Sequence, residues 1–238
     1  IKDFNSNLLI GIFHLKNKNI DEAKKYFKTL KNFDTNSDIE NLLATLLDTW
    51  SQIIESKDLN KSISLVQNLS PRLENIKNIQ ETFIHCYYDS EKTSNIFKKL
   101  IENEEIDYSR YFFFHANYLK KNKQIKFAEK TIDISINKFP RNLLFNQFKE
   151  DLYENKTSSI SNYFDCKNFS HIIAEIFYLV SNALSVQQNH IYSNYYLNLA
   201  KYLNADFISY DVLVAENYFI IKENKQSLKI YNKIKEKG

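Results

Sequence analysis

The residue types that most often perform catalysis or bind metal ions are scattered along this sequence. No two histidines are spaced three or four residues apart, so no helix would present two imidazoles to one metal ion. His85 and Cys86 are adjacent, but neighbouring residues on a helix point about 100° apart, which makes a poor nucleophile and base pair. Glu102, Glu104 and Glu105 fall between two expected helices and are typical of solvated charge at a turn. The sequence therefore predicts no enzyme, no metal site and no cofactor.

The positions of the cysteines and glycines indicate whether zinc sites, disulfides or phosphate-binding loops are expected. Cys86 and Cys166 stand apart with no paired-cysteine spacing, so we expect neither a zinc site nor a disulfide framework, but two buried, small apolar residues. Gly11 and Gly238 are the two glycines of the chain. Phosphate-binding loops and dinucleotide folds need glycine where the backbone turns sharply or meets a phosphate, and this chain lacks it.

The composition indicates an all-α protein. The 238 residues are 43% hydrophobic and 26% charged, as in globular proteins, and two prolines leave long segments whose charges recur with helical spacing. The net charge is +3 with lysines interspersed among acids, so no nucleic acid is expected as a partner. The longest apolar run, Ile172–Val180, contains Glu175 and is shorter than the ~20 residues that cross a bilayer. We therefore expect no membrane span.

The stretch Tyr111–Pro140 carries the clearest spacing. Ala116, Ala128 and Pro140 follow one another at steps of twelve residues, with a polar turn at Lys121–Lys126. In two antiparallel helices, a small residue on each lets the backbones approach closely, and proline ends the second helix. The spacing predicts a helix, a tight turn and a second helix.

This stretch resembles the tetratricopeptide repeat, a pair of helices with a period of about 34 residues. The family positions Trp, Gly, Tyr, Ala, Phe and Pro are taken here by Phe112, Ala116, Leu119, Ala128, Ile132 and Pro140. The resemblance implies a right-handed α-solenoid of antiparallel helix pairs without a β-sheet. It is similar to the long tetratricopeptide arrays of proteobacteria, some of which are exported.

Weaker versions of the pattern extend over nearly the whole chain. We expect about four helix pairs and one further helix over residues 1–154, an irregular linker over residues 155–168, and two more pairs over residues 169–238. The pairs are expected at Asn7–Asp34, Ile39–Leu69, Leu73–Glu102, Tyr111–Pro140, Phe169–Asp206 and Ile208–Lys237, with the further helix at Leu143–Tyr153.

The ends of the chain suggest a segment of a longer array. The next repeat proline would fall one residue after Gly238, and residue 1 is not methionine. We therefore expect the residues that decide between the bacterial cytoplasm and the periplasm or cell envelope to precede Ile1.

The resemblance also implies a binding surface, because the first helix of each pair lines a concave groove in that family. Asn117 and Asn182 stand where an amide would bond a peptide backbone, whereas Phe113 and Tyr178 replace the cations that clamp a terminal carboxylate. The aromatic stripes are expected to pack in the core. The candidate groove residues are Arg110, Phe113, Asn117, Lys120, Lys121, Tyr178, Asn182 and Glu216.

Three functions remain open from the sequence. The first is a scaffold that binds a peptide or helix of another protein in its groove. The second is a non-catalytic arm of a larger enzyme that positions a substrate or partner. The third, a helical repeat that binds RNA, predicts a continuous basic groove, and Glu55, Glu175 and Glu216 argue against it.

Overall fold

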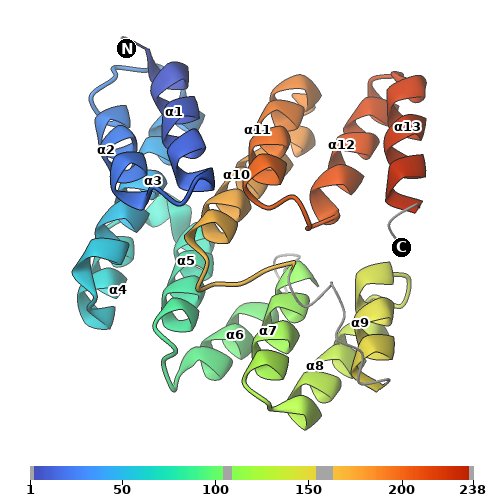
Figure 1. Ribbon diagram of the computed structural model, residues 1–238. Helices are drawn as coiled ribbons and strands as arrows, with labels where there is room; N and C mark the ends of the chain where they lie inside the picture. Colours follow the sequence, from blue (N-terminus) through green and yellow to red (C-terminus); the bar gives the residue numbers. More distant parts are fainter. Residues whose placement is uncertain (1–2, 104–108, 154–162, 236–238) are drawn as a thin grey trace. The chain divides into compact units, whose positions relative to one another are not determined.

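The computed structural model describes residues 3–103, 109–153 and 163–235, and within these ranges every regular element is helical. The prediction of an all-α protein is confirmed in these ranges, and Figure 1 shows the helices. The α-helices are α1 (Phe4–Lys16), α2 (Ile20–Leu30), α3 (Asp38–Ser56), α4 (Leu59–Gln67), α5 (Glu74–Tyr87), α6 (Thr93–Ile101), α7 (Ser109–Lys121), α8 (Ile125–Lys138), α9 (Leu143–Tyr153), α10 (Phe169–Val186), α11 (His190–Leu203), α12 (Ser209–Ile220) and α13 (Asn224–Lys235), and a 3-10 turn spans Pro71–Leu73.

One turn type connects the two helices of several pairs. In it, the second residue after the helix adopts a left-handed conformation, as Lys123 does after α7 with φ 59°. The Lys123 amide donates to the Lys120 carbonyl, and the next amide, of Gln124, donates to the Leu119 carbonyl. These two hydrogen bonds cap the C-terminus of the helix, and the left-handed residue of such a cap is usually glycine. Left-handed residues occupy the corresponding turns at Lys18, Lys57, Asp89, Lys123, Gln188 and Lys222.

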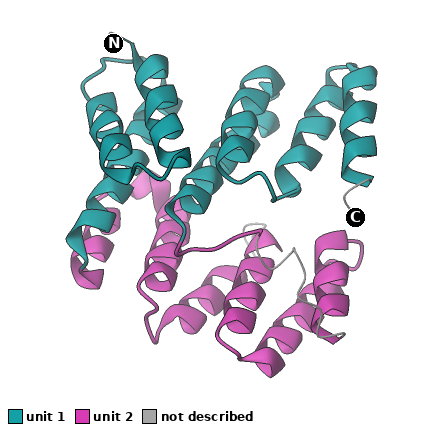
Figure 2. Cartoon of the chain, in the orientation of Figure 1, with its two compact units in different colours: residues 1–57, 168–238 teal, residues 58–167 magenta. Residues whose placement is uncertain are grey.

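The chain divides into two compact units (Figure 2). Unit 1 combines residues 1–57 with residues 168–238, and unit 2 consists of residues 58–167. Within unit 2, the helices from α4 to α9 pack largely against their neighbours in sequence. Within unit 1, α1 contacts α11 and α3 contacts α10, so segments far apart in the sequence share one core. A strictly linear array would bring together only neighbouring pairs.

A buried amide joins three helices of unit 1. Asn217 of α12 is fully buried, and its Oδ1 accepts a 2.6 Å hydrogen bond from Ser185 of α10 and lies 3.0 Å from His190 Nδ1. Its Nδ2 donates to Ser193 Oγ and Asn194 Oδ1 of α11, both at 2.8 Å. A buried polar group with every bond satisfied fixes one packing arrangement of α10, α11 and α12.

Helix α10 is the most apolar element of unit 1. Among the described helices it is the one long and apolar enough to cross a membrane by length and composition, with a mean hydropathy of 1.4 over 18 residues. However, 56% of that window is buried inside the protein, including the side chain of Glu175. A core helix passes the same test, and packing against α11 and α3 accounts for this composition.

The glycine of α1 allows α2 to approach closely. A Cβ added at Gly11 would lie 2.6 Å from Cε1 and 2.8 Å from Cδ1 of the Phe27 ring. Phe27 is fully buried, so its ring cannot move out into solvent without losing burial. Ala23, twelve residues after Gly11, is also fully buried. Gly11 therefore lies in close contact with a side chain of α2.

We expect Gly11→Ala to lower the free energy of unfolding by about 1 to 2 kcal/mol, because overpacking outweighs the roughly 1 kcal/mol by which alanine favours a helix. Urea unfolding would measure this loss. Combining the change with Phe27→Leu, which removes the ring atoms, should recover part of the stability. A Gly11→Ala variant as stable as the unmodified chain would contradict the close approach.

Candidate functional site

The candidate site lies on α7 in unit 2, where a non-helical segment of the same chain covers the helix. The segment is Tyr163–Lys167, the described part of the predicted linker, and it contains no helix; residues 155–162 of that linker lie outside the described ranges. Tyr163 and Phe164 are 8% and 3% exposed, so the segment is packed against the helices. Two predicted groove residues of α7 hold it.

Asn117 and Lys121 bind the backbone and a side chain of this segment. Asn117 Nδ2 donates a 2.9 Å hydrogen bond to the Phe164 carbonyl, and Lys121 Nζ lies 3.4 Å from the same oxygen. Lys121 also forms a 3.0 Å ion pair with Asp165. The prediction that Asn117 can bond a peptide backbone therefore describes a contact within the chain.

Aromatic rings make up the apolar part of the contact. The Phe164 ring stacks on Phe114 with ring centroids 3.9 Å apart and an angle of 16° between the planes. The ring of Phe83 on α5 lies beside both of these rings. Its centroid is 5.1 Å from that of Phe164 and 6.1 Å from that of Phe114. Phe113, predicted to line the groove, is fully buried against Phe148 instead of facing a ligand. Phe164 therefore belongs to an aromatic cluster with Phe83 and Phe114.

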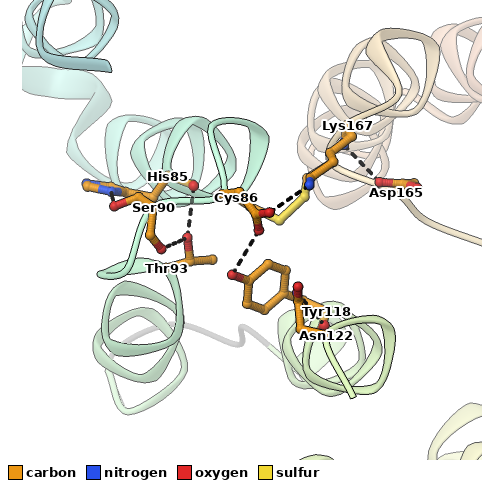
Figure 3. Close-up of polar contacts among 10 residues, drawn as sticks. His85, Cys86, Ser90, Thr93, Tyr118, Asn122, Asp165 and Lys167 are labelled. Atoms are coloured by element: carbon orange, nitrogen blue, oxygen red, sulfur yellow. Dashed lines mark hydrogen bonds and ion pairs between the residues drawn. A yellow bond between two sulfur atoms is a disulfide. The ribbon is translucent and has the colours of Figure 1, made fainter. Parts of the chain in front are cut away.

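The expectation of two isolated cysteines is wrong, because Cys86 of α5 and Cys166 form a disulfide (Figure 3). Their Cα atoms are 5.9 Å apart although 80 positions separate them in sequence. Both are buried, as expected, with 1% and 6% of their surface exposed. Cysteine spacing motifs did not reveal this bond, because they detect only cysteines that lie a few residues apart in the sequence. The one sequence signal was that the chain has two cysteines, an even number.

Charged and hydroxyl groups contact the C-terminal end of the segment, at Lys167. Lys167 Nζ forms a 2.9 Å ion pair with Asp89, the left-handed residue between α5 and α6. The Tyr118 hydroxyl of α7 donates to the other Asp89 oxygen at 3.4 Å (Figure 3). Burial is the main cause that raises the pKa of Tyr118, so the hydroxyl keeps its proton. A cavity of about 140 Å³ remains between the segment and the two helices.

The remaining predicted residues of α7 pack on aromatic rings. The Arg110 guanidinium lies 5.4 Å from the centre of the Phe114 ring, and Lys120 Nζ lies 5.3 Å from that of Phe148. Burial lowers the pKa of Lys120 from its usual value. Both cations therefore contribute to the packing of α7 as well as to its charge.

The predicted groove residues of unit 1 lie on α10 and α12, which contact each other. Asn182 and Glu216 are exposed, and the Tyr178 ring packs 6.0 Å from that of Tyr210. Partial desolvation of its carboxyl raises the pKa of Glu216. Unlike Asn117, Asn182 stands at the surface.

A second concave region of unit 2 contains the pair Ser94 and His115. A groove of about 620 Å³ is lined by side chains of α6, α7 and α8, and His115 Nε2 lies 2.8 Å from Ser94 Oγ at its base. His115 is fully buried and stacks on Phe97, and burial, with Lys98 nearby, lowers its pKa to about 4. Its Nδ1 has no hydrogen-bond partner in the described part of the chain. A weak base without an orienting carboxylate is poorly suited to activate a serine.

Within the ranges that the structure describes, no group of three or more histidine, cysteine, aspartate or glutamate residues is arranged to hold a metal ion. The geometry of α7 is that of a helix surface on which a non-helical segment of the chain is held. No protein-family model matches the sequence, and a search of curated proteins finds no match either.

Proposed function

We propose that this chain is a non-catalytic scaffold that binds an extended segment or helix of another protein along the first helices of its helix pairs. One observation carries the proposal: Asn117 and Lys121 already hold a non-helical segment through its backbone carbonyl. We further propose that the pairs stack as a right-handed, tetratricopeptide-like solenoid within the units. The recurring left-handed turns and the close contact at Gly11 support this arrangement.

Binding of this kind needs no covalent chemistry. An amide side chain that donates to a backbone carbonyl does so whatever the partner's sequence, so such contacts provide affinity without selectivity. Apolar and charged neighbours then select the partner's side chains. In unit 1, Asn182 is available for the first role and Glu216 for the second, since both are exposed.

A selection from a display library of random peptides, using the immobilised oxidised protein, tests this proposal. We expect selected peptides to bind Asn182→Ala at least about tenfold more weakly than the unmodified chain, the loss expected for one or two hydrogen bonds. Glu216→Gln should weaken the binding of peptides that carry lysine or arginine.

Asn224→Ala is the matched control, because Asn224 is an exposed asparagine on α13, the second helix of its pair. Its affinity for the same peptides should equal that of the unmodified chain. If no peptide is selected, or if Asn182→Ala binds as tightly as Asn224→Ala, the assignment of the α10 and α12 surface is overturned.

A further inference from the structure

We propose that the face of α5 and α7 beneath Tyr163–Lys167 is a second recognition site, specific for extended peptides in which an aromatic residue precedes an acidic one. The chain's own copy of that pattern occupies it, and the Cys86–Cys166 disulfide keeps it there until a dithiol reductant opens it. This inference rests on the proposed function, since it takes the site to bind polypeptide segments.

The recognition chemistry has three separate parts. Phe114 and Phe83 accept an aromatic ring, Lys121 pairs with a carboxylate on the following residue, and Asn117 bonds the carbonyl between them. These three contacts could form equally with another polypeptide in which an aromatic residue precedes an acidic one. Release of the segment would break the hydrogen bond of the buried Asn117 amide and the ion pair of Lys121, which favours a partner that restores both contacts.

Ion pairs add little to the aromatic stack and the Asn117 hydrogen bond that hold the segment. The pairs Lys121–Asp165 and Lys167–Asp89 are partly solvated, since Lys121 and Asp165 are 34% and 38% exposed and Lys167 and Asp89 are 53% and 47% exposed. Such pairs contribute little to stability. The cavity of about 140 Å³ shows that the segment does not fill the surface beneath it. The disulfide is therefore the strongest link between the segment and α5.

The opening step is thiol–disulfide exchange. One thiolate of a dithiol attacks a sulfur of the Cys86–Cys166 bond and forms a mixed disulfide, releasing the other cysteine as a thiolate that takes up a proton. The second thiolate of the reductant then displaces the remaining cysteine. The two electrons come from the dithiol, which leaves as a disulfide, and both cysteines become thiols. Because both are buried, the segment must lift locally before the attack.

The test uses a fluorescent peptide with the sequence of residues 163–167 carrying Cys166→Ser, titrated into the full chain. In the chain variant Phe164→Ala, Asp165→Ala, Cys166→Ser, the built-in segment is weakened and the site becomes available. We expect this variant to bind the peptide at least about tenfold more tightly than the oxidised, unmodified chain. Adding Asn117→Ala to the variant should remove that gain, as should a peptide in which lysine replaces the aspartate.

Equal affinity of the variant and the oxidised chain would overturn the proposal. If the variant does not fold, the unmodified chain is used with the peptide that retains its cysteine, in a glutathione buffer. Mass spectrometry should then detect a mixed disulfide at Cys86 that forms at least about tenfold faster than with a scrambled peptide of the same composition. Equal rates would equally reject the site. Since the display experiment depends on Asn182 and Glu216, its failure would be distinguishable from failure at Asn117.

Discussion

We expect the replacement of both Cys86 and Cys166 with serine to lower the free energy of unfolding by about 4 kcal/mol. The two residues are 80 positions apart, and a cross-link that closes so long a loop removes much of the conformational entropy of the unfolded chain. The cysteines are buried beside the aromatic stack of Phe83, Phe114 and Phe164, so loss of the bond also loosens that contact. Urea unfolding followed by circular dichroism would measure the change.

The unmodified chain unfolded in the presence of a dithiol is the matched comparison, because it breaks the same bond without changing side-chain volume. It should lose a similar free energy. Trp50 is the single tryptophan and belongs to unit 1, so its fluorescence follows the unit that does not contain the disulfide. A loss below about 1 kcal/mol in both samples would show that the bond does not constrain unit 2.

Acidification from pH 7 to pH 4 is expected to remove about 3 kcal/mol of stability through His115 alone. The folded-state pKa of about 4 lies below the value of 6.5 for an unperturbed histidine, because burial disfavours the charged ring. The unfolded chain therefore binds a proton in this window that the folded chain does not. The stabilisation is complete above pH 6.5 and is lost as the pH falls toward 4.

Unfolding free energies measured across this pH range for the unmodified chain and His115→Phe would isolate the contribution. The phenylalanine keeps a ring on Phe97 but cannot take up a proton, so the pH dependence of the variant should be shallower. Ser94→Ala provides the control, since it removes the hydrogen-bond partner and leaves the histidine. Parallel profiles for the unmodified chain and His115→Phe would rule out a buried neutral histidine.

The proposals assign different states to the two candidate surfaces. On α10 and α12, Asn182 and Glu216 are exposed, whereas on α7 the corresponding Asn117 is 1% exposed and bonded to Phe164. Two asparagines that the repeat resemblance predicts to correspond thus differ in exposure, since Asn182 is exposed and Asn117 is covered. Disulfides persist in oxidising compartments, where the α7 site would stay closed.

The helices of this protein could be predicted from the sequence because their signals are local. The steps of twelve residues and the helical spacing of apolar residues act within one pair, as the contact of Gly11 with Phe27 illustrates. The scarcity of glycine likewise excluded whole classes of phosphate site. The left-handed turns, however, use lysine, aspartate and glutamine instead of glycine, so composition did not mark them.

The sequence by itself determined the all-α class, and it placed Asn117, with its amide side chain, on a predicted helix. Only the tertiary structure decided that this amide bonds the backbone of Phe164, 47 residues away, and that Cys166 reaches Cys86. It also decided that α1 and α3 pack against α11 and α10. The physical reason is that periodicity reports which face of a helix is apolar, whereas pairing of distant segments depends on the path of the whole chain and on the combined packing of many side chains.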